Sequence, residues 1–279
     1  MNSVEFTNVC FSYIQAEQKE SNKNFIHNLN LNIKDNSFLA LLGKNGSGKS
    51  TLIKLMFGIE KALSGNIKVF NKSINEKAFE IYKIASLVFQ NPDEQIVADT
   101  VELDVAFAME NYSVSSKDMN KKIDKVLEIV DLKHKRKDYV YSLSGGEKQR
   151  LCIASSLVLN PKILVLDEPT SMLDSENRNK IIELLKKIHS NGTTIIIVTH
   201  NINEIEYCND ILFMNNGNID FYGYKNEFVD RLIKSNEFHN LNLPINFQIA
   251  YEFYKNKNIL LSNEIFDYKK ICEKIWKSF

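Results

Sequence analysis

Short runs of apolar residues alternate along the chain with longer segments whose apolar positions recur at helical spacing. The apolar runs predict buried strands at residues 38–42, 84–89, 163–166 and 194–198. A helix is predicted over 121–130. Because buried strands that alternate with helices are typical of a mainly parallel sheet covered by helices, we predict an α/β fold.

Two other parts of the chain follow a different pattern. Residues 4–13 and 25–33 alternate between apolar and polar positions, which predicts antiparallel strands joined by the polar stretch 16–24. Residues 211–222 predict a hairpin, because the asparagines and glycine at 215–218 suit the left-handed backbone angles of a tight turn. The sequence therefore predicts an antiparallel β subdomain beside the main sheet.

The predicted domain division follows from length and from where these patterns stop. A chain of 279 residues exceeds the usual size of one domain but is short for two. No strand pattern is found between 92 and 142, so we predict a helical insertion at about 92–160. Residues 226–279 are rich in aromatic residues and lack catalytic patterns. We predict a main domain at 1–225 and a small C-terminal segment at 226–279.

The charges of the chain balance. Thirty-five Lys and Arg residues face thirty-five Asp and Glu residues, so no overall field favours nucleic acid or anionic lipid, and no nucleic-acid partner is predicted. The basic cluster at 133–137 is interpreted as a solvated loop rather than as a phosphate-binding patch.

Cysteine spacing and apolar run length bear on the compartment. The four cysteines are far apart and form no Cys-x-x-Cys pair, which favours free thiols in a reducing cytosol over a zinc site or disulfides. Residues 1–12 do not resemble a signal peptide. The longest apolar runs, such as 38–42, reach five residues, whereas a bilayer span needs roughly 20. Membrane contact is therefore expected only through partner proteins.

A phosphate-binding loop is predicted at 43–51, between a predicted strand and a helix at 51–56. Glycines let successive backbone N–H groups point at phosphate oxygens, Lys49 would neutralise the β and γ phosphates, and Ser50 would supply a hydroxyl to Mg²⁺. A glycine-rich turn without a ligand is the alternative. Five of the ten glycines lie here or at 145–146, which favours a ligand. The predicted ATP-binding residues of this loop are Gly43, Asn45, Gly46, Ser47, Gly48, Lys49, Ser50 and Thr51.

Two carboxylates end the predicted strand at 163–166, and a histidine ends the one at 194–198. The carboxyl ends of parallel strands open onto the ligand crevice of such sheets. Asp167 is placed to hold Mg²⁺ through water, and Glu168 to deprotonate the attacking water as general base. His200 would contact the γ phosphate. The alternative for the acidic pair is a helix N-cap with an acidic first turn, and for the histidine a structural role.

Residues 143–150 resemble the signature motif of the ABC transporter family, and Gly146 precedes Asp167 by 21 positions, a spacing typical of that family. The resemblance implies a P-loop NTPase fold of ABC type that binds ATP and Mg²⁺ and hydrolyses ATP. It also implies a dimer, because each ATP in the family is held between one subunit's P-loop and the other's signature. The implied trans ligands are Ser144, Gly145, Gly146 and Glu147, where many ABC proteins have Gln at the last position.

Three further segments match motifs of the same family. Gln90 matches the Q-loop glutamine, which contacts Mg²⁺ and the membrane partner, so it joins Glu168 and His200 as a catalytic residue and Ser50 and Asp167 as a metal ligand. Asp174 matches the D-loop. Tyr13 matches the aromatic residue that stacks on adenine, with Phe11 as the alternative.

Within the family, residues 90–95, 101–107 and 170–174 resemble the ATP-binding subunits of energy-coupling factor (ECF) importers, including the cobalt type. Gly223, Phe228 and residues 241–244 are similar to the C-terminal dimerisation segment of those subunits. The resemblance implies a translocase ATPase on the cytoplasmic side of the cell membrane that powers import of a vitamin or of a transition metal such as cobalt. Its partners would be a second ATPase, identical or paralogous, a transmembrane coupling subunit and a substrate-binding membrane subunit.

Two alternatives stay open at this point. One is the ATPase of a conventional ABC importer or exporter. The other is a soluble ABC ATPase for iron–sulfur scaffold assembly.

Overall fold

The computed structural model describes residues 1–13, 25–112, 114–235 and 243–278, so the predicted joining stretch 16–24 lies outside the described residues. The chain divides into two compact units. The larger unit comprises residues 1–38 and 50–198, and the smaller unit comprises 39–49 and 199–279. The boundary predicted near residue 225 is a different division, and it stays a prediction.

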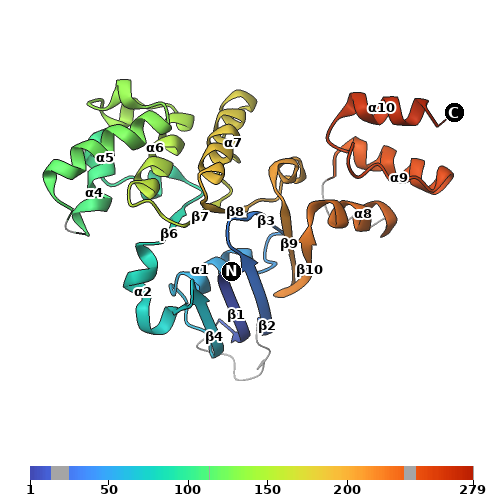
Figure 1. Cartoon of the computed structure of the whole chain (residues 1–279), viewed down its shortest axis with the longest axis horizontal. Helices are drawn as coiled ribbons and strands as arrows, with labels where there is room; N and C mark the ends of the chain where they lie inside the picture. The colour runs from blue at the N-terminus through green and yellow to red at the C-terminus, as the bar shows by residue number, and fades with distance from the viewer. Residues whose placement is uncertain (14–24, 113, 236–242, 279) are drawn as a thin grey trace. The chain divides into compact units, whose positions relative to one another are not determined.

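An antiparallel sheet forms the N-terminal part of the larger unit (Figure 1). Its strand order is β2-β1-β4-β5, and Phe6 of the central strand pairs with Leu31 on one side and Ile67 on the other. The strands are β1 Asn2–Phe11, β2 Ile26–Lys34, β4 Ser64–Val69 and β5 Lys72–Ser73. Alternating burial along β2 agrees with a sheet that has one face packed on the core, and the predicted antiparallel strands are confirmed.

Three parallel strands of the larger unit place the functional segments. They are β6 Ala85–Val88, β7 Ile163–Asp167 and β8 Thr194–Val198, with Leu87 beside Val165 and Val165 beside Ile196. Four of the five β7 residues and all of β8 are buried, which explains why both read as uninterrupted apolar runs. Because the strands are parallel, the segments that follow them leave the sheet at the same edge.

The helical insertion is confirmed between β6 and β7. Its helices are α3 Pro92–Gln95, α4 Val101–Glu110, α5 Ser116–Ile129 and α6 Gly145–Leu157, with short 3₁₀ turns η1 Lys133–Lys135 and η2 Val140–Ser142. The helix predicted at 121–130 begins earlier, because the Ser115 side chain caps it by accepting from the Asp118 N–H. The larger unit also contains α2 Ile74–Tyr82 and α7 Ser175–Ser190. Helix α1 Lys49–Met56 begins directly after Gly48 of the predicted phosphate-binding loop.

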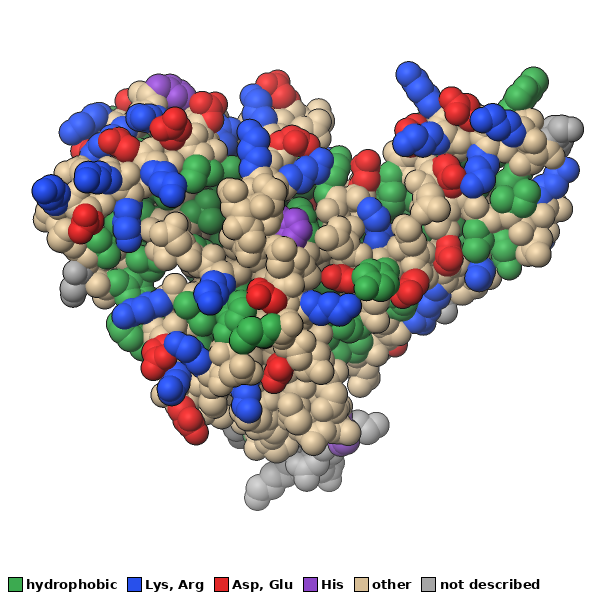
Figure 2. Space-filling view, in the orientation of Figure 1, with side chains coloured by type: hydrophobic (Ala, Val, Ile, Leu, Met, Phe, Trp, Pro, Cys, Tyr) green, Lys and Arg blue, Asp and Glu red, His purple; other side chains and the backbone are tan. Residues whose placement is uncertain are grey.

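The prediction of a solvated loop at 133–137 is wrong for two of its members. Residues Lys133–Lys135 form a 3₁₀ turn, and the side chains of Lys135 and Arg136 are only 26% and 22% exposed. Arg136 binds Glu102 and Asp124, and Lys135 binds Glu147. The sequence could not show this, because the partner carboxylates belong to three different helices. In Figure 2, Lys and Arg side chains accordingly lie interspersed with Asp and Glu over the part that contains α4, α5 and α6.

The smaller unit contains a parallel pair, a hairpin and the C-terminal helices. Strand β3 Phe38–Leu42 runs parallel to β9 Asp210–Asn215, and β10 Asn218–Tyr224 returns antiparallel to β9. Asn216 and Gly217 have φ angles of 46° and 78°, so the predicted hairpin turn is confirmed. A 3₁₀ segment, η3 Ile202–Tyr207, precedes β9, and the C-terminal helices are α8 Lys225–Ser235, α9 Ile245–Lys257 and α10 Tyr268–Trp276.

Candidate ATP-binding and catalytic site

The predicted phosphate-binding loop lies between β3 and α1 and depends on unusual backbone angles. Gly43 has a φ of 153°, and a Cβ added there would lie 2.4 Å from Ser47 Oγ and 2.5 Å from the Met214 carbonyl oxygen. Gly46 and Gly48 have φ angles of 78° and 108°. Side chains at these positions would be strained or would fill the concave side of the loop, so the sequence folds here into a tight ring of backbone.

Two polar side chains of this loop suit phosphate. The buried Lys49 ammonium donates to the carbonyl oxygens of Gly43 at 2.8 Å and Lys44 at 3.0 Å. The Ser47 hydroxyl is buried and has no hydrogen-bond partner among the described residues. A buried polar group without a partner is costly, and a phosphate oxygen would satisfy this one. The loop therefore fits the phosphates of ATP.

The aromatic candidates for adenine differ in accessibility. Tyr13 is 48% exposed, whereas Phe11 is 3% exposed and packs edge-on against the Tyr13 ring at 4.8 Å. The Tyr13 hydroxyl lies 2.8 Å from Thr51 Oγ1, which ties the ring to the first turn of α1. Tyr13 is the more accessible ring of this pair, so the geometry favours it for stacking on a base.

The structure brings together the predicted general base and the Q-loop glutamine. The Gln90 Nε2 donates to a Glu168 carboxylate oxygen at 2.8 Å, although the two residues are 78 positions apart. Glu168 has a left-handed φ of 45°, its N–H donates to the Val198 carbonyl, and its own carbonyl accepts from the Ser171 hydroxyl. This turn directly after β7 and the bond from Gln90 hold Glu168 in place.

The predicted metal ligands have the chemistry that Mg²⁺ prefers. Ser50, Gln90 and Asp167 offer hydroxyl, amide and carboxylate oxygens, and each side chain is exposed or half-buried. In the described part of the chain no group of three or more His, Cys, Asp or Glu could hold a metal ion. Mg²⁺ usually keeps several waters and binds substrate phosphates together with one or two carboxylates, which fits this small set of oxygen ligands.

His200 lies two residues after the end of β8, in the smaller unit, and its side chain is exposed. The neighbouring backbone is held by the Thr199 N–H, which donates to the Leu41 carbonyl, and by the Thr199 hydroxyl, which accepts from the Asn201 N–H. Its contact with a γ phosphate stays a prediction.

The predicted signature residues form the first turn of α6. Ser144 is the N-cap, and its hydroxyl oxygen accepts from the Glu147 N–H at 3.4 Å. Glu147 in turn accepts from the Ser144 N–H at 2.8 Å, which completes a capping box. This role explains why an acidic residue is tolerated at position 147: its carboxylate serves the helix cap, and a phosphate would meet the backbone N–H groups.

The capping carboxylate is also ion-paired, since Lys135 Nζ lies 2.6 Å from the second Glu147 oxygen. Partial burial opposes ionisation of Glu147, but the bonds from Lys135 and Ser144 outweigh it and lower its pKa from 4.5 to about 2. Glu147 is thus a charged, fully engaged group at neutral pH.

The D-loop residue Asp174 is hydrogen-bonded to Asn177, and Asn177 lies against the signature residue Gly146. Asp174 caps α7 by accepting from the backbone and side-chain N–H groups of Asn177 at 2.8 and 2.9 Å, and the backbone bond is the main cause of the lowered pKa of Asp174. A Cβ added at Gly146 would lie 2.6 Å from Asn177 Oδ1, whereas one at Gly145 would meet nothing within 4 Å. Gly146 is therefore required for the close approach of α7 to α6.

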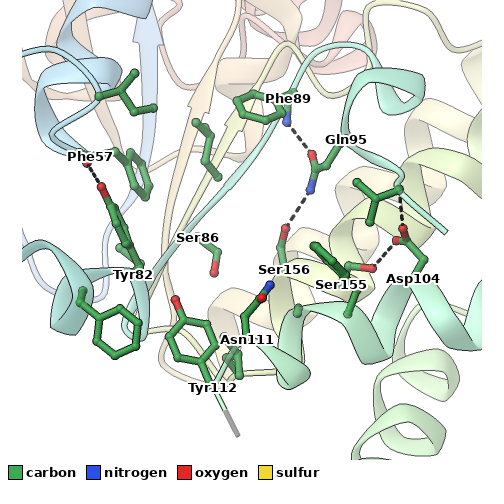
Figure 3. A pocket seen from close by; sticks show the side chains of 18 residues that line it. Phe57, Tyr82, Ser86, Phe89, Gln95, Asp104, Asn111, Tyr112, Ser155 and Ser156 are labelled. Carbon is green, nitrogen blue, oxygen red and sulfur yellow. Dashed lines mark hydrogen bonds between the residues drawn. The ribbon is translucent and has the colours of Figure 1, made fainter.

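A groove of about 600 Å³ opens beside the Q-loop (Figure 3). Its walls are mainly apolar and include the exposed rings of Phe79, Phe89 and Phe107. Gln95 links the groove to the Q-loop segment and to helix α6. Its oxygen accepts from the Phe89 N–H at 2.9 Å, and its nitrogen donates to the Ser156 hydroxyl of α6 at 3.4 Å. The groove wall is thus hydrogen-bonded to the residue before Gln90 and to the signature helix.

Sequence reasoning missed Gln95, Lys135 and Asn177. Asn177 follows the D-loop aspartate by three positions, where an N-cap side chain finds its partner, so capping rules could have identified it. Gln95 and Lys135 carry no comparable local signal, because their side-chain partners Ser156 and Glu147 are 61 and 12 positions away, and the other partner of Gln95 is a backbone N–H.

Comparison with known proteins agrees with this geometry. The protein-family model described as ABC transporter matches residues 26–171. The chain is 40% identical to the energy-coupling factor transporter ATP-binding protein EcfA1 of Ligilactobacillus salivarius over 276 residues, which cover 98% of this chain and 95% of that protein. The chain belongs to the ABC transporter family. It is an ABC ATPase of the P-loop α/β class, and both the predicted fold class and the predicted ATPase activity are confirmed.

Further relatives of this ABC ATPase point the same way. It is 36% identical to EcfA1 of Clostridium perfringens over 95% of this chain and 94% of that protein. Among solved structures, cbiO1 from Clostridium perfringens, part of the ABC transporter complex cbiONQ, has a TM-score of 0.73 at 30% identity and covers 85% of this chain and 97% of its own. A dimeric ATP-binding cassette in a post-hydrolysis state, bound to ADP and Pi, has a TM-score of 0.70 at 29% identity, with coverage of 79% and 98%.

Proposed function

We propose that this chain is the ATP-hydrolysing subunit of an ECF-type importer, which takes up a vitamin or a transition metal ion such as cobalt. The observation that carries the proposal is a link between the general base and the apolar groove. Gln90 binds Glu168, and the preceding residue, Phe89, lines the groove and donates its N–H to Gln95, which lines it too. An ATPase that drives a partner needs such a link between its general base and a docking surface. The two relatives named EcfA1, which align over nearly the whole chain, support the ECF assignment.

The chain's own residues divide the work of hydrolysis. Lys49, the loop N–H groups and Ser47 bind the phosphates, and Tyr13 stacks on adenine. Glu168, oriented by Gln90, accepts the proton of the attacking water, and His200 contacts the γ phosphate. Ser50, Gln90 and Asp167 would hold Mg²⁺, which would offset the phosphate charge.

A second ATPase subunit completes each site. The first turn of α6 presents the N–H groups of Gly145 and Gly146, which suit the γ phosphate of an ATP bound to the opposite subunit. The similar cassette that is dimeric and bound to ADP and Pi supports a dimer. Residues 226–279 would add a second contact: Ile245 and Trp276 are 58% and 83% exposed, and Figure 2 shows hydrophobic side chains at the surface over α9 and α10. The partner is an identical chain or a paralogue.

The groove beside the Q-loop receives the transmembrane coupling subunit. Its apolar lining and exposed phenylalanine rings suit an amphipathic helix of that subunit. A separate membrane subunit binds the cargo. None of the described helices is long and apolar enough to span a bilayer. On this proposal the ATPase lies at the cytoplasmic side of the cell membrane and contacts it through these partner subunits.

The test is purification of the tagged chain carrying Glu168→Gln from native membranes in the presence of ATP, followed by mass spectrometry. This change removes the base and should hold ATP in a closed dimer. Recovery of a multi-span protein with a small second membrane protein supports the proposal, and the ligand bound to the second protein identifies the cargo. Recovery of soluble proteins alone would overturn it and favour scaffold assembly.

A pair of groove variants sharpens that test. Phe107→Glu places a charge in the groove. Ile129→Glu is the control, because Ile129 does not line the groove but is similarly exposed, at 41% against 47% for Phe107. We expect the first change to lose the multi-span protein and the second to retain it. Equal recovery with both variants would exclude the groove as the docking surface.

A further inference from the structure

The basic turn at 133–137 touches the signature through one side chain. Lys135 Nζ lies 2.6 Å from Glu147 Oε1, and the Lys135 and Glu147 side chains are 26% and 17% exposed. Its neighbour Lys133 points elsewhere, to Glu128 at 3.1 Å, in a pair that is mostly exposed. Lys137 binds Glu102. Of these three lysines, only Lys135 meets the first turn of α6.

The turn itself is held in place without Lys135. The Arg136 guanidinium binds Glu102, Asp124 and Asn120 at 2.7–2.8 Å, which anchors the turn to α4 and α5. The backbone adds a second anchor, because the carbonyls of Arg136 and Asp138 accept from the first N–H groups of α4. Removing the Lys135 ammonium should therefore leave the turn where it is and change only the charge beside Glu147.

Glu147 has two consequences for a phosphate at the signature. As a capping residue it orders the first turn of α6 and so aligns the Gly145 and Gly146 N–H groups. As an anion in that same turn it repels a phosphate, and it offsets part of the positive potential that the helix N-terminus would offer to that phosphate. The capping role depends on hydrogen bonds, and the repulsion depends on net charge, so a cation that cancels the charge keeps the benefit and removes the cost.

We infer that Lys135 is a positioning residue that neutralises the signature glutamate, so that the α6 N-terminus can accept the γ phosphate of an ATP held by the opposite subunit. This inference rests on the proposed function, because it requires the signature to bind ATP in trans. Since Glu147 stands where many ABC proteins have an uncharged glutamine, Lys135 and Glu147 together act as one neutral signature residue.

The test measures ATP turnover by the complex recovered from membranes, with wild-type chain, Lys135→Ala, Lys135→Arg, Lys133→Ala, and Lys135→Ala combined with Glu147→Gln. We expect Lys135→Ala to raise the ATP concentration for half-maximal turnover about tenfold, a change that corresponds to about 1.4 kcal/mol. Lys133→Ala, the matched control in the same turn, and Lys135→Arg should stay within about twofold of wild type. The double variant should recover most of the loss caused by Lys135→Ala, because it removes both charges and glutamine can still cap the helix.

The outcomes separate the inference from the function on which it rests. If Lys135→Ala behaves like Lys133→Ala, or if Glu147→Gln does not restore the double variant, the neutralising role is refuted and Lys135 is only structural. If the wild-type complex does not hydrolyse ATP at all, the proposed function fails first. If Lys135→Ala does not fold, Lys135→Arg and the double variant still decide, since charge compensation requires both of them to be active.

Discussion

Replacing Gly146 by alanine should destabilise the ATPase, whereas the same change at the adjacent Gly145 should not. A Cβ at Gly146 would lie 2.6 Å from Asn177 Oδ1, 2.7 Å from its Cγ and 3.1 Å from its Cβ, but a Cβ at Gly145 meets no atom within 4 Å. Alanine in place of glycine in a helix gains about 1 kcal/mol, and overpacking of this kind costs about 1–3 kcal/mol. We expect the two variants to differ in free energy of unfolding by about 2 kcal/mol.

Urea unfolding followed by circular dichroism, without nucleotide, measures this difference apart from any effect on phosphate binding. The midpoint should fall for Gly146→Ala and hold or rise for Gly145→Ala, with unchanged slope. Adding Asn177→Ala removes the two atoms of closest approach and leaves its Cβ at 3.1 Å. The double variant should therefore recover part of the loss, with a coupling energy of at least about 1 kcal/mol. Equal stability of the two glycine variants would refute the argument that α7 requires glycine at 146.

Three further expectations concern other parts of the site. Arg136→Ala should lower the free energy of unfolding by about 2–3 kcal/mol in urea titrations, because it removes the bonds to Glu102, Asp124 and Asn120 together and leaves the half-buried Glu102 with Lys137 as its remaining cation. Lys137→Ala, at an 81% exposed side chain, should cost less than about 0.5 kcal/mol. Tyr13→Ala should weaken ATP binding by about 0.5–1.5 kcal/mol in calorimetry, and Tyr13→Phe should retain most of it if stacking is the cause. The lowered pKa of Glu147 predicts that its contribution to stability is complete above pH 4.5 and is lost as the pH falls toward about 2. Carboxyl-carbon NMR titration reads that pKa directly, and a value near 4.5 would contradict the ion pair.

Local patterns were enough to predict most of the described strands. Strand β3 was predicted to its last residue and β8 likewise, because both are buried along their whole length and no polar position interrupts them. Helix starts were predicted less well. The start of α5 was missed because Ser115 and Asp118 form a side-chain cap outside the apolar repeat, and α1 begins at Lys49 rather than at 51.

Two short motifs also identified the chain as an ATPase of the ABC type. The phosphate-binding loop and the signature are contiguous, and their chemistry needs residues that lie next to one another: glycines for backbone angles, a lysine for charge and a helix start for N–H groups. Such requirements leave a mark in a single stretch of sequence, so they could be read without a structure.

The sequence by itself therefore determined the fold class and the ATPase assignment, while the individual phosphate and signature residues stay predictions. Only the tertiary structure decided how these segments are supported: Gln90 against Glu168, Gln95 against Ser156, Asn177 against Gly146 and Lys135 against Glu147. Each of these pairs joins residues on different elements, and the interaction depends on distance in space and on burial. A charged or amide side chain on an isolated helix looks like a solvated one until the packing of the helices brings its partner within hydrogen-bond distance.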